Sequence, residues 1–189
     1  QMILASTRDL RVILILLADR LQLLRSPGQV PEDARPALAR ETLAIYAPIA
    51  HRLGVHTFKA ELEDRAFRLQ QPEAWAELQA RVEARIAERS TRIEAINGEL
   101  RELLAAHGVR GEVLGRTKHL YSIHQKMHRD RLDLERVYDL LASRIILETT
   151  EECYRVLGLV HAAYTPMPGR FKDYIALPKE NGYQSLHTL

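Results

Sequence analysis

The sequence has very little cysteine and no long apolar run. Cys153 is the only cysteine, so the chain forms no internal disulfide and no cysteine-based zinc site. A lone cysteine suits a reducing compartment, and we expect a cytoplasmic location. The most apolar stretch, "VILILLA" at 12–18, is much shorter than the ~20 residues that span a bilayer. No secretory signal peptide is visible, and we expect no membrane partner.

Strong charge of one sign is also missing. The formal net charge is +2 over 189 residues, which is too small for a protein whose main partner is a nucleic-acid backbone. We therefore expect no DNA partner. Two phosphate-binding signatures are absent as well, the P-loop GxxxxGK[ST] and the GxGxxG turn. The chain is therefore not an ordinary P-loop kinase or Rossmann protein.

What is present indicates a globular protein that buries a core. Hydrophobic residues make up 46% and charged residues 28% of the chain, which are ordinary proportions for such proteins. The length suits one large domain or parts of two. The sequence begins at Gln1 and stops at Leu189 inside a predicted strand, so we interpret it as an internal piece of something longer.

The first 108 residues predict an all-helical segment. We expect helices over 8–25, 31–53, 58–70 and 72–106. The first is expected to be buried, with polar ends. Pro31 is expected near the first turn of the second helix, and Pro36 and Pro48 lie inside it, so it is expected to be kinked or broken. Thr57 could cap the third helix. The fourth has one apolar stripe and ends at Gly108.

From about residue 109 the pattern changes to short strands and helices. We expect strands over 109–116, 140–148, 174–178 and 183–189, and helices over 120–128 and 151–164. The stretch "LLASRIILE" at 140–148 is β-branched and apolar, which is typical of a central strand. The predicted class is therefore α+β, with an all-helical part followed by an α+β part.

The stretch "GRTKHLYSIHQKM" at 115–127 is the first candidate for chemistry. Arg116 and Lys118 alternate out of a strand end, and Ser122 and Lys126 share a face of the following helix. They would converge where a strand meets a helix N-terminus, which is a natural anion site. The alternative is a solvated basic face, which is the commoner meaning of such spacing alone.

Asp139 in "VYDLLASRII" is the second candidate. A carboxylate at the mouth of a strand, beside cations, could hold Mg²⁺ on a triphosphate. The alternative is an Asp that merely caps the strand entry.

The turn "KENG" within "RFKDYIALPKENGYQSLH" at 170–187 is the third candidate. Tyr183 could stack on a base and Asn181 could bond a base or ribose edge. Lys179 and His187 could contact phosphate. The alternative is a hairpin-type turn in which Asn181-Gly182 only supplies positive φ.

The remaining candidates are on the helical part. Asp19 could be a metal ligand, although it needs His or Asp partners that are not seen nearby; the alternative is an internal pair with the adjacent Arg20. The other histidines suggest no metal. His51 and His56 are interpreted as ordinary. We interpret three more as surface or phosphate-adjacent residues, namely His119, His124 and His128.

Five stretches in order carry a resemblance to a known family. They are "ETLAIYAPIAHRLG", "ELEDRAFR", "GRTKHLYSIHQKM", "YDLLASRII" and "PMPGRFKDYIALPKENGYQSLHT". The sequence resembles the RelA/SpoT family, the long (p)ppGpp synthetase/hydrolases of bacterial starvation signalling (the stringent response). The resemblance implies the C-terminal part of an HD-type hydrolase domain over 1–70, a helical connector over 71–108, and the N-terminal part of a nucleotidyltransferase-like α+β synthetase domain over 109–189.

The family's synthetase transfers a pyrophosphoryl group from ATP to the 3′-hydroxyl of GDP or GTP. The resemblance implies an ATP site at Arg116, Lys118, Ser122 and Lys126. It implies guanine-nucleotide contacts from Lys179, Asn181, Tyr183 and His187, with Tyr183 stacked on the base. Catalytic roles fall to Lys172 and Asp139, with Asp139 also binding Mg²⁺. The "RFKD" at 170–173 resembles the bifunctional branch of the family.

Two departures from the family limit what the chain is expected to do. The family's hydrolase helix reads Asp-Arg-Leu-His-Asn-Met-Arg, whereas this chain keeps Asp19, the implied Mn²⁺ ligand, and has Gln22 and Leu23 at the His and Asn positions. A Leu cannot hydrogen-bond a nucleotide, so ppGpp hydrolysis is expected to be impaired. The rest of the hydrolase metal cluster and the second synthetase carboxylate are expected outside the chain, so the chain alone is expected to be inactive.

Partners follow from the same resemblance. We expect ATP, GDP or GTP, and ppGpp, with a ribosome contact through a C-terminal region outside the chain. The competing hypothesis is a non-catalytic regulatory or RNA-binding module that uses the basic "GRTKHLYSIHQKMHRDR" surface. Mg²⁺ dependence distinguishes the two, because an RNA module binds through salt-sensitive backbone contacts.

Overall fold

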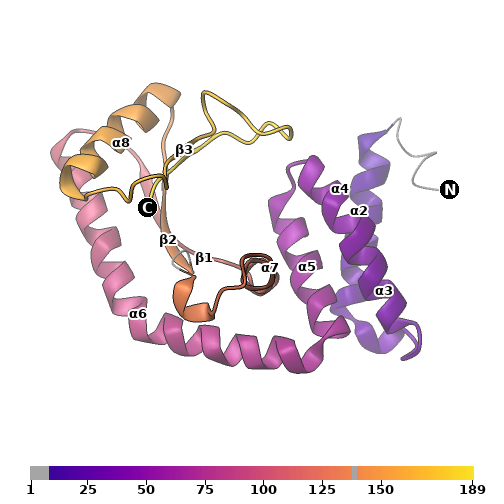
Figure 1. Cartoon of the computed structure of the whole chain (residues 1–189). Coiled ribbons are helices and arrows are strands. Elements are labelled where there is room, and N and C mark those ends of the chain that lie inside the picture. The colour runs from indigo at the N-terminus through magenta and orange to yellow at the C-terminus, as the bar shows by residue number, and fades with distance from the viewer. Residues whose placement is uncertain (1–8, 138–139) are drawn as a thin grey trace. The chain divides into compact units, whose positions relative to one another are not determined.

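The computed structural model describes residues 9–137 and 140–189, which form two compact units (Figure 1). The first unit comprises the chain up to Ala80 together with His119–Asp130. The second comprises Arg81–Lys118 and Arg131–Leu189. Helices dominate, and the strands are few, short and antiparallel. The predicted α+β class is confirmed. Within the described residues, no helix combines the length and apolar character that crossing a membrane requires.

The first unit is built around helix α5. Its elements are α2 (Leu10–Arg25), η2 (Pro27–Gln29), α3 (Arg35–Glu41), η3 (Thr42–Tyr46), α4 (Ala47–Arg52), α5 (His56–Gln70), the first residues of α6 (Pro72–Ala106) and α7 (Leu120–Asp130). Helix α5 contacts α2, α3, α4 and α7, and Figure 1 shows α2 to α5 gathered together. The core includes Leu17, Leu21 and Leu24 of α2 with Leu62 of α5.

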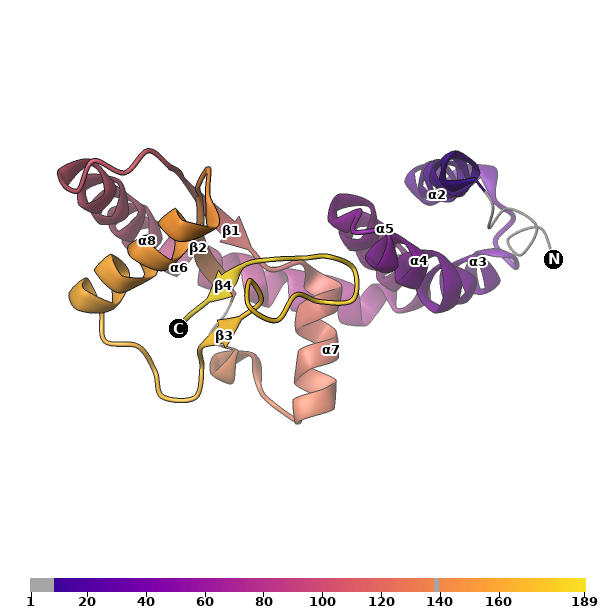
Figure 2. The ribbon, with the colours of Figure 1, turned by 90° about the horizontal axis from the view of Figure 1, so that it is seen from above.

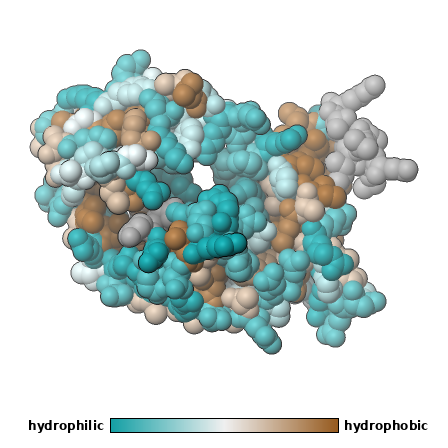
Figure 3. All heavy atoms as spheres, viewed as in Figure 1, coloured by the Kyte–Doolittle hydropathy of each residue, from teal (hydrophilic) through white to brown (hydrophobic). Residues whose placement is uncertain are grey.

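Only one face of α2 is buried, although we expected the whole helix to be buried. A run of seven apolar residues covers every side of a helix, but packing against one neighbour buries only residues three and four apart. Leu14 and Ile15 are therefore 43% and 67% exposed, while Leu17 is 1% exposed. Figure 3 shows hydrophobic residues reaching the surface of this helical unit.

The proline-containing region after α2 forms two short helices, α3 and α4, interrupted by a π-helical turn. Pro36 lies in the first turn of α3, and Pro48 lies in the first turn of α4. Pro48 has no N–H to donate to a carbonyl one turn back, and a π-helical turn, η3, joins the two helices there. The break at the prolines was expected, but Pro31 precedes α3 by four residues and is not in its first turn.

Helix α5 begins without the side-chain cap that we expected. Its N-cap is Val55, which makes no capping hydrogen bond, and Thr57 lies inside the helix. The expectation that Thr57 caps this helix is therefore wrong, because the helix begins two residues earlier than a cap at Thr57 would require.

The second unit contains two two-stranded sheets, and helices α6 and α8 pack on one face of the β1–β2 sheet. Its elements are the remainder of α6, β1 (Glu112–Thr117), η4 (Leu134–Arg136), β2 (Leu141–Ile146), α8 (Thr150–Ala163), β3 (Lys172–Asp173) and β4 (Leu186–His187). Strands β1 and β2 are antiparallel, as are β3 and β4. Helix α8 contacts β4 (Figure 2). The core gathers Leu100 and Leu104 of α6, Val113 of β1 and Val156 of α8.

Strand pairing decides which side chains face away from this core. Val113 pairs with Ile145, and both pack in the core. Side chains alternate between the two faces of a sheet, so the residues at even positions, among them Arg116 and Arg144, lie on the opposite face. On the core side, fully buried Asn97 of α6 accepts a hydrogen bond from the Ser143 hydroxyl at 2.6 Å. The sheet is thus apolar toward α6 and cationic on its other face.

Helix α6 matches the sequence pattern closely, whereas the later strands do not. The helix runs over the expected Pro72–Ala106 and is followed by Gly108 at φ 64°. Strand β2 was expected to be central, yet among the described residues it pairs with β1 alone. The expected strand 174–178 is a turn, because the Asp173 carboxylate accepts the backbone N–H groups of Ile175 and Ala176 at 2.9 and 2.8 Å. Of the expected strand 183–189, only β4 forms.

Candidate functional site

A cluster of cations surrounds His187 in the second unit. His187 is half-buried on β4. Its pKa is lowered, first by burial and then by four positive charges. These charges belong to Lys179, Arg116, Lys172 and Arg144. The fold thus brings together four residues that the sequence marked for nucleotide chemistry (Arg116, Lys172, Lys179 and His187) and adds Arg144.

The positive charge of this cluster is not compensated within the described residues. Over 9–137 and 140–189, no carboxylate forms a salt bridge with Arg116, Arg144 or Lys172. Arg116 and Arg144 are exposed on the face of the β1–β2 sheet that points away from the core. Such a concentration of one sign attracts polyanions.

Two tyrosines lie against the same cluster. The Lys179 ammonium is 4.5 Å from the centre of the Tyr174 ring and 4.9 Å from that of Tyr183. The Tyr183 hydroxyl lies 2.8 Å from Nε2 of His187. The Tyr174 ring centre is 5.2 Å from that of His187. An aromatic face, an imidazole and a cation therefore meet at one end of the β3–β4 hairpin.

The turn 179–182 explains how these groups meet. The Gly182 N–H donates to the Lys179 carbonyl at 2.8 Å, and Gly182 has φ 75°. The Asn181 side chain accepts from the Tyr183 N–H at 3.2 Å. Asn181-Gly182 therefore does form the turn that the alternative interpretation described. The same turn also brings Lys179 to the tyrosines, so the two interpretations do not exclude each other.

The four residues predicted to hold ATP are divided between the two units. Arg116 and Lys118 lie on and just after β1 in the second unit, whereas Ser122 and Lys126 lie one turn apart on α7 in the first. Their convergence stays a prediction. Asp139, predicted to bind Mg²⁺, lies outside the described residues.

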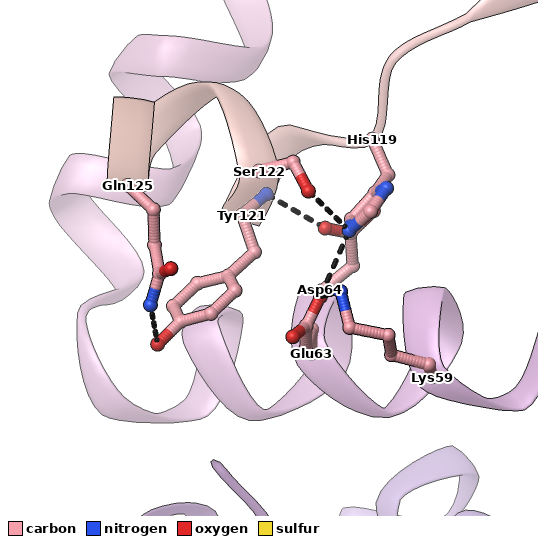
Figure 4. Close-up of polar contacts among 7 residues, drawn as sticks. All are labelled: Lys59, Glu63, Asp64, His119, Tyr121, Ser122 and Gln125. Atoms are coloured by element: carbon pink, nitrogen blue, oxygen red, sulfur yellow. Dashed lines mark hydrogen bonds and ion pairs between the residues drawn. The ribbon is translucent and has the colours of Figure 1, made fainter. Parts of the chain in front are cut away.

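Helix α7 begins against two carboxylates of α5 (Figure 4). Oδ1 of Asp64 accepts the Tyr121 N–H at 2.8 Å. Burial, the largest influence, raises the pKa of Asp64, and this hydrogen bond opposes the rise. The helix N-terminus that we predicted as an anion site therefore already contacts an anionic group of the protein.

His119 connects the other carboxylate to α7. Its Nε2 lies 2.9 Å from Oε2 of Glu63 and 2.8 Å from Oγ of Ser122. Lys59 pairs with the same Glu63 oxygen at 3.2 Å. The sequence suggested a surface or phosphate-adjacent histidine, and in the structure His119 is partly buried and contacts both α5 and α7.

The described residues of the helical part do not form the set of metal ligands that metal chemistry there would need. Asp19 is exposed, and no group of three or more His, Cys, Asp or Glu in the described ranges is arranged to hold a metal. The alternative interpretation, an Asp19–Arg20 pair, is wrong: buried Arg20 pairs with Glu41 at 2.7 Å and lies over the Tyr46 ring. An adjacent Asp on a helix points elsewhere.

Sequence reasoning missed Arg144 and the acidic pair of α5, Glu63 and Asp64. The signal for Arg144 was a cation inside an apolar strand, but its significance depends on the β1–β2 register that places it beside Arg116. Glu63 and Asp64 contact residues far along the chain, so no local spacing pointed to them.

Comparison with known proteins gives consistent matches over both parts. Residues 115–189 match a model described as a region found in RelA / SpoT proteins, and residues 1–56 match an HD domain model. Over 188 residues, and 100% of this chain, it is 47% identical to a GTP pyrophosphokinase of Myxococcus xanthus, covering 25% of that protein. It is 46% identical, over 188 residues, to the bifunctional (p)ppGpp synthase/hydrolase SpoT of Escherichia coli, covering 27% of it.

The chain belongs to the RelA/SpoT family. It spans about a quarter of the length of these relatives. The order of an HD region followed by a RelA/SpoT region is the order that the resemblance implied. For one element, the matched family region and the structural unit do not coincide. Helix α7 lies inside the matched RelA/SpoT region but packs in the first unit, which contains the matched HD region.

Proposed function

We propose that the full-length RelA/SpoT protein carrying this chain transfers a pyrophosphoryl group from ATP to the 3′-hydroxyl of GDP or GTP. Relatives named GTP pyrophosphokinase and (p)ppGpp synthase/hydrolase support this. The observation that carries the proposal is the uncompensated cation cluster around His187, with Tyr183 beside it. Two polyphosphates repel each other, and fixed cations offset that repulsion where charge develops during transfer.

The guanine nucleotide is assigned to the β3–β4 hairpin. The Tyr183 ring stacks on the base, and Lys179 exchanges its contact with the two tyrosine rings for a phosphate. His187 donates to the same phosphates, because an anion there offsets the charges that now lower its pKa. Asn181 holds the turn, and its side chain is the remaining contact proposed for the nucleotide.

ATP is assigned to Arg116, Lys118, Ser122 and Lys126. Arg116 offers a planar guanidinium, which pairs with phosphate oxygens through two parallel hydrogen bonds. Lys172, in the cluster with Arg116, is assigned to charge developing on the transferred group. Arg144 shares the sheet face of Arg116 and adds to the same field.

The resemblance also implies Mg²⁺ for synthesis and Mn²⁺ for hydrolysis. The described residues supply no set of three ligands for either ion, Asp19 is exposed, and Asp139 lies outside the described residues. The residues described do not by themselves fit a metal, and we derive no chemical step through one.

We assign 1–70 to the HD-type hydrolase part, 71–108 to the connector and 109–189 to the synthetase part.

We also propose that ppGpp hydrolysis is weak. Gln22 is exposed on α2, and Leu23 packs against the core of the first unit, so neither replaces the hydrogen-bonding His and Asn of the family. The double change Gln22→His and Leu23→Asn is expected to raise Mn²⁺-dependent ppGpp hydrolysis. Robust hydrolysis by the unchanged protein would contradict this proposal. With ATP and GTP as substrates, the cytoplasm is the proposed location.

The synthetase proposal is tested in the full-length protein with ATP labelled in its terminal phosphates. Incubation with GDP and Mg²⁺ should give labelled ppGpp on chromatography. The variant Arg116→Ala/Lys172→Ala should lose it, because two cations leave the cluster. Arg110→Ala is the matched control, since this exposed arginine precedes β1 and lies outside the cluster. Unchanged ppGpp synthesis by the double variant, or no synthesis by the unchanged protein, would overturn the proposal.

A further inference from the structure

The motif "ELEDRAFR", Glu61–Arg68 on α5, has no role in the nucleotide sites assigned above. In the structure α7 packs against residues of this motif. Asp64 accepts the Tyr121 N–H, and the Phe67 ring centre is 4.3 Å from that of His124. Phe67 is 1% exposed. The motif thus fixes where α7 begins and how it lies against α5, within the first unit.

The hydrogen bonds at His119 constrain which atom carries a proton. Glu63 and Ser122 both approach the same ring nitrogen, Nε2 of His119 (Figure 4). An ionised carboxylate only accepts hydrogen bonds, so Nε2 must carry a hydrogen toward Glu63. A nitrogen with a hydrogen has no lone pair for the Ser122 hydroxyl. Oγ of Ser122 therefore accepts from the same Nε2–H, which it shares with Glu63, and the hydroxyl hydrogen stays available for another acceptor.

This arrangement excludes a nucleophilic serine. In a serine–histidine–carboxylate triad the base and the orienting carboxylate use different ring nitrogens, so that the histidine can take the serine proton. Here both contacts use Nε2, and His119 cannot remove the Ser122 proton while it donates to Glu63. The group that results is a hydroxyl donor of fixed direction.

We propose that Glu63, acting through His119, positions the Ser122 hydroxyl to donate a hydrogen bond to an ATP phosphate. Glu63 and His119 are positioning residues, and Asp64 and Phe67 hold the helix on which Ser122 and Lys126 stand. This inference rests on the proposed function, which gives ATP to Ser122. It places determinants of ATP affinity on α5, before the start of the matched RelA/SpoT region at residue 115.

The test measures binding of a non-hydrolysable ATP analogue to the full-length protein by calorimetry. Ser122→Ala sets the reference, with affinity about tenfold weaker, as for one lost hydrogen bond to a charged group. Glu63→Gln should weaken binding to a similar degree, because a neutral glutamine no longer requires a hydrogen on Nε2, and an unprotonated Nε2 accepts the Ser122 hydrogen. GDP affinity should not change in either variant.

Two comparisons separate positioning from a structural role. The double variant Glu63→Gln/Ser122→Ala should bind no more weakly than Ser122→Ala, because Glu63 acts only through that hydroxyl. His119→Gln keeps an N–H donor and should retain most of the affinity, whereas His119→Leu should lose it. Glu61→Gln is the matched control: the same change on the same helix, at a residue that pairs with Arg25 and Arg65.

The outcomes distinguish this inference from the proposed function. Weakened binding by Ser122→Ala together with normal binding by Glu63→Gln would overturn the inference alone. Additive losses in the double variant, or equal losses for His119→Gln and His119→Leu, would also overturn it. Normal binding by Ser122→Ala would overturn both the inference and the assignment of ATP to Ser122. Thermal unfolding of each variant confirms that the compared proteins are folded.

Discussion

Two charged clusters among the described residues are organised in opposite ways. At the α5–α7 contact every described charge meets a partner: Glu63 meets Lys59 and His119, and Asp64 meets the first turn of α7. Around His187 the cations Arg116, Arg144 and Lys172 meet no carboxylate among the described residues. Compensated charges fix a structure, whereas uncompensated charges of one sign repel each other and favour binding of an anion.

The difference implies different responses to ligands. Because the repulsion around His187 destabilises the folded second unit, any polyanion that binds there and not to the unfolded chain stabilises it through mass action. The charges at the α5–α7 contact already have partners, so this contact stabilises the first unit without any ligand. The predictions below weaken one cluster at a time, from the largest expected effect to the smallest.

The largest effect is expected from Phe67→Ala, which removes the hydrophobic centre of the α5–α7 contact. Phe67 is 1% exposed and packs against the rings of Tyr121 and His124. Loss of a buried phenylalanine ring typically costs ~3–5 kcal/mol of unfolding free energy. Urea unfolding of the chain measures the cost, and Phe171→Ala, at a ring that is 44% exposed, is the control. A cost below that of the control would mean that α7 is held by its polar contacts alone.

The next effect is expected in the other cluster, from Tyr183→Ala. Loss of a base stack typically weakens binding by ~1–3 kcal/mol, so calorimetry on the full-length protein should show weaker GDP binding with little change in stability. Tyr164→Ala is the control, since Tyr164 contacts Glu99 and lies outside the cluster. Unchanged GDP affinity in Tyr183→Ala would identify this ring as a packing residue.

The molecule also shows which structural features can be predicted from the sequence. Helix α6 was predicted with nearly the bounds it has, because its apolar stripe, the opening proline and the closing Gly108 are all local signals. The turn at Asn181-Gly182 was likewise readable. The family followed from stretches such as "PMPGRFKDYIALPKENGYQSLHT", whose order and length are specific.

What was missed depends on contacts between distant residues. The role of Arg144 requires the register of β1 against β2, and the role of Glu63 requires α7 to dock on α5. Neither is encoded in local spacing. The stretch 174–178 has strand composition, but the Asp173 side chain accepts the N–H groups of Ile175 and Ala176, and a side chain that competes for backbone donors overrides propensity.

A smaller effect, ~1–2 kcal/mol of unfolding free energy, is expected from Asp64→Ala, which leaves the Tyr121 N–H without its acceptor. Asp64→Asn should cost much less. Burial raises the pKa of Asp64, which means that its charged form is disfavoured in the fold, and the neutral amide keeps an acceptor oxygen. Urea unfolding at neutral pH compares the two. If Asn costs as much as Ala, the charge of Asp64 and not its acceptor atom holds α7.

The smallest effect is expected from the proton on His187, and it tests whether the second cluster receives an anion. Burial and the nearby cations lower its pKa in the free protein. Bound phosphate offsets those cations and should raise this pKa, so the complex takes up a proton in the pH window between the two values. GDP affinity should therefore increase as pH falls through that window, by ~0.5–1 kcal/mol, since one pKa unit corresponds to about 1.4 kcal/mol. Calorimetry in buffers of different ionisation enthalpy measures the uptake, and His187→Gln should abolish it.

Without ligand, the lowered pKa of His187 has the opposite consequence. The unfolded chain binds the proton more tightly than the folded chain, so stability falls as pH drops below ~6.5, the ordinary histidine value. Proton release on GDP binding would show that the phosphates lie away from His187, and that the uncompensated cations serve another anion.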